Sequence, residues 1–381
     1  MAQKLHLTLT TTLTLLDQFQ TAIATATTTT TTETTTTETT TTETTTTETI
    51  TTKDALPLLS ASSLSLKSQI TKLSLVSITA PFTPTAAVPI LTALNESVLP
   101  SLVTAALLIT ATDHTQAFQT EAHALTKLAL TELSVLLHEV QGIATRRDGP
   151  TANKKKELAQ PDKDAVTLAA ARAWESCDAL VDLAAKGVVG FVVRRVEQWR
   201  DLVRDAVGEI EEWDPDEEGD EFFDELLSDD DGDADTQNKK GEDEEDDDDE
   251  EESKALHAQK KSTLRVLKPI AQVYPAIVTH RLKRTADAVA EVRRLEALME
   301  NLQVIPELVD EIAGALYEAD PDRSGRFLGQ TKDRAVKALE VVKLPWQQGT
   351  TGEEKEDKFT TWVTTWLKVM DELSKSVFGS A

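Results

Sequence analysis

The chain has 381 residues, enough to bury a substantial core in one large or two ordinary domains, and its formal net charge is −27 at pH 7. Between residues 209 and 252 there are 27 acidic residues against two bases, Lys239 and Lys240, so the rest of the chain is nearly neutral. Because the negative charge is confined to one block, it does not reflect an acidic surface over the whole protein that would raise its solubility. It indicates a local segment that is not packed into the core.

Three features bear on the compartment. Cys177 is the only cysteine, which excludes an intramolecular disulfide and favours a reducing compartment. The start, MAQKLHLTLTTTLTLL, lacks the cationic residues and unbroken apolar run of a secretory signal. No stretch reaches the roughly 18 apolar residues needed to span a bilayer. We therefore expect a soluble intracellular protein with no membrane partner.

The first predicted element is an N-terminal helix, whose apolar residues recur every three or four positions from Leu5 to Ile23. Residues 27–48 then repeat threonine and glutamate with a period of five, which fits neither a helix nor a coiled coil and offers almost nothing to bury. We expect a low-complexity loop over residues 27–52. A phosphorylated or glycosylated stalk is the alternative.

Further helices are predicted along the N-terminal domain. Two short ones cover residues 64–78 and 85–99, separated by APFTP. A long helix covers residues 101–146, with apolar side chains along one side from Phe118 to Ile143. The basic stretch that follows, RRDGPTANKKK at 146–156, predicts a solvated loop or a weak nuclear import signal.

The stretch before the acidic block carries the strongest helical signal. Gly187 and Gly190 separate it from an alanine-rich helix over 165–185 and mark a turn or a kink. Eight apolar residues then alternate in steps of three and four on one helix face, up to the stop at Pro215. They are Val189, Val192, Val196, Trp199, Val203, Ala206, Ile210 and Trp213.

The acidic block, residues 214–253, is predicted to be a disordered insertion because like charges repel and few apolar residues compete. Two apolar pairs stand within it, Phe222 with Phe223 and, four places later, Leu226 with Leu227. In a helix these pairs would form a one-turn apolar stripe, which makes them candidates for docking to a partner.

The alternatives are no contact, or contact with basic faces of the chain itself within residues 260–268 or 280–284. Ser228 precedes three aspartates and is a candidate phosphosite, where a phosphate would deepen the negative field.

After the acidic block, apolar residues from Leu295 to Leu316 again alternate in steps of three and four, as in a zipper. Pro306 removes a hydrogen bond in mid-helix and favours two helices packed into their own core. A dimer or partner-helix seam is the alternative. The predicted helices of this part cover residues 254–302, 307–317, 332–342 and 353–378.

No convincing period-two pattern competes with these helices. The predicted fold class is all-α, with long antiparallel helices in bundles of the five-helix type. The expected domains are an N-terminal bundle over 1–213, the acidic insertion over 214–253, and helices over 254–378 that complete the bundle or form a second one.

Motifs of catalysis or cofactor binding do not occur in the sequence. There is no phosphate-binding glycine loop, zinc helix or nucleophile elbow, so we expect no enzyme, cofactor or metal. The stretch DPDRSGRF, from Asp320, starts like a calcium loop but has Thr331 where a glutamate is needed, so we expect a polar turn. Cys177 lies among apolar residues and is interpreted as core. A basic patch with interleaved aromatics is missing, so nucleic acid is not expected as a partner.

Several segments resemble the cyclin-D-binding protein family. These are ARAWESCDAL, GVVGFVVRRVEQWRDLVRDAVGEIEEW, the acidic block and the helix that opens KSTLRVLKPIAQVYP, within residues 60–375. The resemblance implies an all-helical, non-enzymatic protein of the nucleus and cytoplasm that binds D-type cyclins or helix-loop-helix factors. It further implies negative regulation of cell-cycle progression or transcription. The threonine repeat departs from the family pattern.

The leading functional hypothesis is therefore an interaction protein, in which a helical bundle presents helix surfaces to a cyclin-like or helix-loop-helix partner. An acidic chaperone for histones or other basic proteins is the first alternative, with the acidic block as its binding element. A vinculin-like cytoskeletal adaptor is a further alternative.

Overall fold

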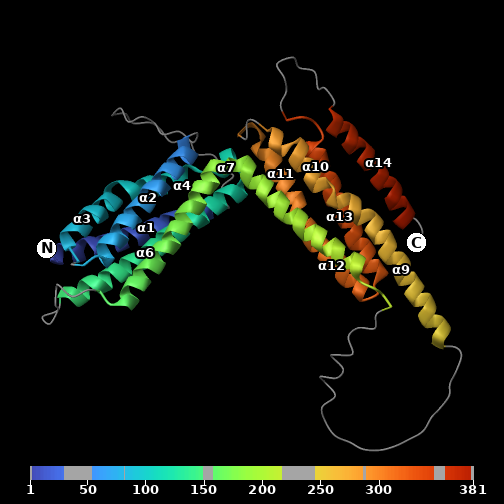
Figure 1. Ribbon diagram of the computed structural model, residues 1–381. Coiled ribbons are helices and arrows are strands. Elements are labelled where there is room, and N and C mark those ends of the chain that lie inside the picture. Colours follow the sequence, from blue (N-terminus) through green and yellow to red (C-terminus); the bar gives the residue numbers. More distant parts are fainter. Residues whose placement is uncertain are drawn as a thin grey trace, which may run out of the picture. The chain divides into compact units, whose positions relative to one another are not determined.

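A computed structural model describes residues 2–29, 54–80, 82–148, 158–216, 245–285, 289–346 and 357–378 (Figure 1). The regular structure of these residues is helical throughout, which confirms the predicted all-α class. The contacts divide the chain into two compact units: Met1–Phe191 with Ala288–Val292 form unit 1, and Val192–Asp287 with Arg293–Ala381 form unit 2. This division lies inside one long helix, whereas the predicted N-terminal domain extended to residue 213.

Unit 1 is a bundle whose apolar stripes face one another. Helix α1 packs against α3 and α6, and α2 packs against α3 and α4. Leu5, Leu9, Leu16 and Ile23 of α1 are fully buried, as their spacing predicted. The elements are α1 (Ala2–Thr29), α2 (Ala55–Ile78), α3 (Pro84–Ala93), α4 (Leu99–Leu108), α5 (Ala111–His114), α6 (Gln116–Asp148) and α7 (Gln160–Glu212) as far as Phe191.

The single helix predicted over 101–146 is wrong. Helix α4 ends before Ile109, which is extended (φ −80°, ψ 105°), and α6 begins after Thr115, which has a positive φ of 91°. Neither proline nor glycine marks this break, so no stop signal in the sequence predicted it. The short helix α5 lies between them, and His114 at its end is buried.

The helix predicted over 85–99 continues instead to Leu108. A π-helical turn, Leu94–Val98, joins α3 to α4 without interrupting the helical path. The whole segment, Pro84–Leu108, is long and apolar enough to cross a membrane by length and composition, contrary to the expectation from sequence. Its buried side chains pack against other helices of unit 1, however, as those of a core helix do.

Helix α7 contains one residue with non-helical backbone angles, Gly187 (φ 61°, ψ −171°). This confirms the kink that the glycine pair predicted. Five residues of the predicted stripe on the following turns are buried, and the others are partly buried. The buried ones are Val192, Val196, Val203, Ala206 and Ile210.

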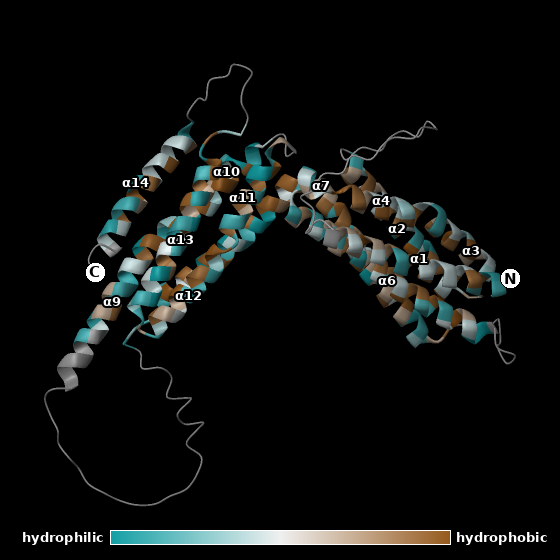
Figure 2. Cartoon of the chain, turned by 180° about the vertical axis from the view of Figure 1, so that it is seen from behind, coloured by the Kyte–Doolittle hydropathy of each residue, from teal (hydrophilic) through white to brown (hydrophobic). Residues whose placement is uncertain are grey.

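Unit 2 is a second bundle, in which α9 packs against α10, α12, α13 and α14, and α12 packs against α13. Each of its helices carries a hydrophobic and a hydrophilic side (Figure 2). The elements are α7 from Val192, α9 (Glu245–Ala271), α10 (Val273–His280), α11 (Val292–Leu302), α12 (Ile305–Tyr317), α13 (Pro321–Val342) and α14 (Lys358–Phe378), with 3-10 turns at Leu282–Arg284 and Val289–Glu291.

Three boundaries around the predicted loops need correction. Helix α1 extends to Thr29, so it includes the first residues of the loop predicted over 27–52. Helix α2 begins at Ala55, nine residues before the predicted start at residue 64. Helix α9 begins at Glu245, inside the predicted disordered insertion of 214–253. The helix predicted over 254–302 is wrong: it is divided into α9, α10 and α11, with 3-10 turns after His280.

The proline argument for the zipper-like stretch is confirmed. Helix α11 ends at Leu302 and α12 begins at Ile305, with Pro306 in its first turn, where its missing N–H is not needed. All seven residues of the pattern are fully buried in the unit itself, namely Leu295, Leu298, Leu302, Ile305, Val309, Ile312 and Leu316.

The polar turn predicted at DPDRSGRF is instead the start of a helix. Asp320 is the N-cap of α13, and its carboxylate accepts a hydrogen bond from the backbone N–H of Arg323 at 2.9 Å. Pro321 follows at a position that suits the first helical turn. Helix α13 therefore begins well before the predicted start at residue 332.

Candidate functional site

The residues predicted to dock a partner lie outside the described part of the chain. Phe222, Phe223, Leu226 and Leu227, together with the candidate phosphosite Ser228, belong to residues 217–244. The structure does describe both ends of this stretch, because α7 leads into Asp216 and α9 begins at Glu245. The site is therefore built from the residues at these ends.

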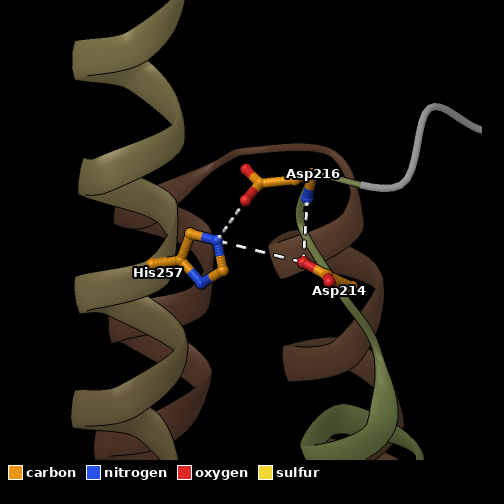
Figure 3. Close-up of side chains that lie close together, drawn as sticks. All are labelled: Asp214, Asp216 and His257. Atoms are coloured by element: carbon orange, nitrogen blue, oxygen red, sulfur yellow. Dashed lines mark hydrogen bonds and ion pairs between the residues drawn. The ribbon is translucent and has the colours of Figure 1, made fainter.

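Three exposed side chains meet beyond the end of α7, beside α9 (Figure 3). The imidazole Nε2 of His257 lies 3.0 Å from an Asp216 carboxylate oxygen and 3.9 Å from one of Asp214. Ser253 also donates a hydrogen bond to Asp216. The hydrogen bonds from Ser253 and His257 lower the pKa of Asp216. This cluster holds the first residues after α7 against α9.

The same cluster could accommodate a metal ion by distance, since its ligand atoms lie within 4.8 Å of one another. All three groups are exposed, and Asp216 already accepts hydrogen bonds from Ser253 and His257. A solvated group of hydrogen bonds and ion pairs explains the arrangement without a metal.

Two lysines of α9 bind the end of α7. Lys260 donates hydrogen bonds to the carbonyl of Glu211, at 3.0 Å, and to that of Trp213. Lys268 Nζ lies 2.6 Å from a carboxylate oxygen of Glu211. The carbonyls at the end of a helix lack intrahelical partners and carry partial negative charge, so cations there are favourable.

Two further cations of α9 belong to the same surface. Lys261 and Arg265 are exposed, and within the described ranges neither makes an ion pair. They line a surface groove of about 650 Å³. We call this surface the α9 basic face and define it by His257, Lys260, Lys261, Leu264, Arg265 and Lys268. The sequence indicated these lysines and the arginine only as a face for internal contact.

A second groove, of about 530 Å³, lies between α10 and α14 and is lined by stacked rings. The ring centres of His280 and Phe359 are 5.6 Å apart, and those of Phe359 and Trp362 are 5.5 Å apart. Below them, Arg281 is buried with its guanidinium 4.3 Å from the centre of the Phe359 ring. These aromatic residues fix α14 on α10.

Arg281 also joins the ends of three helices. Its guanidinium donates to the carbonyl of Val342 at 2.7 Å, to that of Lys343 at 2.8 Å, and to the Asp357 carboxylate at 2.7 Å. The hydrogen bond from Arg281 is the largest cause that holds the pKa of Asp357 well below its usual range. Sequence reasoning missed this role, because a basic residue beside Lys283 and Arg284 reads as surface.

Unit 1 buries the titratable side chains of Cys177, His114 and His123. Burial raises the pKa of the Cys177 thiol to about 12, which suits the predicted core position and opposes a reactive thiolate. Burial also lowers the pKa of His114 and of His123, and His123 Nε2 donates to the Ala106 carbonyl at 3.0 Å. Both histidines therefore have a packing role.

Residues 58–216, from the first turns of α2 to the Asp216 cluster, match the family model described as Grap2 and cyclin-D-interacting, N-terminal. This part of the chain, less than half of its 381 residues, is therefore similar to the N-terminal domain of the Grap2 and cyclin-D-interacting family. The match confirms the resemblance to cyclin-D-binding proteins over residues 60–216 of the predicted 60–375. No curated protein matches the chain.

The Grap2 and cyclin-D-interacting domain implies that protein partners are part of the function. Its family is one of protein-interaction domains and is not a known enzyme family. The matched region ends where the acidic block begins, so the α9 basic face lies outside it. The family model therefore gives no information about that face.

Proposed function

We propose that the protein is a non-enzymatic regulator that binds a D-type-cyclin-like or helix-loop-helix partner and thereby restrains cell-cycle progression or transcription, in cytoplasm and nucleus. The family match over residues 58–216 carries this proposal. The absence of a basic DNA-binding region suits a protein that sequesters its partners.

The helices of the matched domain offer apolar contact points. On α2, Leu64 is 52% exposed and Leu75 is 55% exposed. They are three helical turns apart and so lie on the same side of the helix. Exposed apolar residues aligned on one helix can anchor a partner, since buried apolar contact supplies most binding energy at an interface.

The test measures binding of the full chain to a purified D-type cyclin and to a helix-loop-helix protein by isothermal titration calorimetry. We expect saturable binding to at least one of them, weakened about tenfold or more by Leu64→Glu with Leu75→Glu. Leu202→Glu, at an exposed leucine of unit 2, is the matched control and should leave the affinity unchanged. Lack of binding to both partners would refute the proposal.

An acidic chaperone for histones or other basic proteins is the second candidate, favoured by the 27 acidic residues between 209 and 252. Replacing residues 217–244 by a glycine-serine linker separates the two functions. A chaperone would lose its binding of a basic protein, and the binding that the natural chain shows would fall steeply with salt. A helix-surface mechanism predicts that cyclin binding survives the replacement with a slower association rate.

A further inference from the structure

We propose that the α9 basic face is a docking site for an acidic helix of a partner protein that carries apolar residues on one side. The inference rests on the proposed function, because it assumes that the chain works by binding proteins. It adds a surface on unit 2, outside the matched family domain, and the chemistry that this surface recognises.

The cations of this face divide into two pairs with different tasks. Lys260 and Lys268 are held by the end of α7, at Glu211 and Trp213. Lys261 and Arg265 stand four residues apart, hence one turn apart on the same side of α9, and their charges meet no acid among the residues that the structure describes. The first pair fixes the face, and the second is available to a ligand.

Apolar surface lies between the charges. Leu264 is partly buried and lines the groove together with the exposed Lys261 and Arg265. The methylene stems of lysine and arginine add further apolar surface below their charged heads. A ligand for this groove therefore needs apolar side chains for Leu264 and carboxylates, one turn apart, for the two cations.

The positive charge of the α9 basic face favours a partner whose contact surface is negatively charged. Four lysine and arginine side chains gather on this face within residues 260–268, in a chain whose net charge is −27. The chain's own acidic block enters α9 beside this face, so carboxylates alone would not favour a partner over the chain itself. Apolar contact has to supply the preference, because charge steers encounter while buried apolar anchors hold the complex.

The experiment uses the full chain and a fluorescein-labelled probe, an amphipathic peptide of glutamate and leucine about 15 residues long, enough to form a helix. Fluorescence anisotropy should show saturable binding that weakens as salt is raised. Lys261→Glu with Arg265→Glu should weaken it about tenfold or more, and Leu264→Ser should weaken it several-fold. Lys337→Glu with Lys368→Glu makes the same charge change at exposed positions of α13 and α14 and should have no effect.

Two outcomes would overturn the proposal. One is no binding, or binding that the Lys261 and Arg265 changes leave unaltered. The other is binding that appears only when Phe222, Phe223, Leu226 and Leu227 are replaced by serine, since the groove would then serve the chain's own segment. Cyclin binding measured on the same Lys261 and Arg265 variant distinguishes this failure from that of the proposed function.

Discussion

The two units satisfy their buried polar groups in different ways. In unit 1, Ser63 and Thr126 donate to carbonyls four residues earlier in their own helices, both at 2.7 Å. In unit 2, Tyr274 and Trp366 donate to carbonyls of other helices at 3.0 Å, and Arg281 donates to the end of α13 at 2.7 Å. Unit 1 has a buried bond between helices as well, from His123 of α6 to the Ala106 carbonyl of α4 at 3.0 Å. Unit 2 differs because Tyr274, Trp366 and Arg281 join several pairs of its helices in this way.

The largest loss of stability is expected in unit 2 on substitution of the buried Arg281. Arg281→Met should lower the free energy of unfolding of unit 2 by about 3–5 kcal/mol, because it leaves the carbonyls of α13 and the Asp357 carboxylate without their cation. Hydrogen exchange should show the loss of protection in α10, α13 and α14. Helices of unit 1 should keep their protection.

Arg284→Met is the matched control, because Arg284 is exposed on the turn that follows Arg281. It should change stability by less than about 0.5 kcal/mol. If both substitutions had the same effect, the stabilising role of the buried guanidinium, and with it the contrast between the units, would be wrong.

The sequence predicted the helix faces better than the helix ends, because the two depend on different sequence patterns. The steps of three and four from Val189 to Ile210 predicted a helix face, because only neighbouring turns bring such residues together. The breaks around Thr115 and after His280 depend on tertiary packing and had no proline or glycine to mark them. Pro269, conversely, lies inside α9, so a proline marks a helix boundary at Pro306 and not at every position.

In unit 1 a smaller loss of stability is expected from a substitution that strains the backbone at Gly187. Gly187 has φ 61° and ψ −171°, a region that residues with a Cβ almost never adopt. Gly187→Ala should destabilise unit 1 by about 1–3 kcal/mol. The added Cβ would lie 3.9 Å from Leu56 Cδ1, an ordinary contact, so strain and not a clash is the cause. Hydrogen exchange of the unit 1 helices at increasing denaturant concentration measures the change.

Gly208→Ala is the control on the same helix. Its surroundings hold no atom within 4 Å of an added Cβ, and its backbone is helical. Alanine should stabilise this position by about 0.5–1 kcal/mol. Equal signs for the two substitutions would show that the backbone at residue 187 is not constrained as described.

Acid should affect the two units at different pH values, because the lowered pKa values of His114 and His123 in unit 1 and of Asp357 in unit 2 start from different ordinary values. Burial lowers the pKa of His114 and of His123 below the ordinary value of 6.5. The unfolded chain then binds more protons below that pH, so the stability of unit 1 is complete above about pH 6.5 and falls as the pH drops. The lowered pKa of Asp357 places the corresponding loss in unit 2 below its ordinary value of 3.8.

Hydrogen exchange at pH 7 and at about pH 5 should therefore show unit 1 losing protection while unit 2 keeps it. His123→Gln should reduce the pH dependence, since it removes one buried titrating group. His138→Gln, at an exposed position of the same helix, should leave it unchanged. A parallel loss of protection in both units would contradict the assignment.

The candidate site was less predictable than the fold, for an electrostatic reason. The sequence shows four cations on one face of α9, but which of them are neutralised depends on where the end of α7 lies. Glu211 and the carbonyl of Trp213 bind Lys260 and Lys268, whereas Lys261 and Arg265 meet no acid within the described part of the chain. The spacing of residues along α9 cannot show which of its cations will be paired with groups at the end of α7.

The smallest effect is expected for an exposed ion pair between two helices of unit 1, and measuring it tests whether surface charges help to hold these helices together. Lys67 Nζ of α2 lies 2.6 Å from both carboxylate oxygens of Asp178 on α7, and the two side chains are 35% and 58% exposed. Water and salt screen such a pair, so a double-mutant cycle with Lys67→Met and Asp178→Asn should give a coupling of about 0.2–1 kcal/mol. The coupling should decrease further in about 1 M salt. A coupling comparable to the loss in Arg281→Met would mean that unit 1, too, is held by polar contacts between helices.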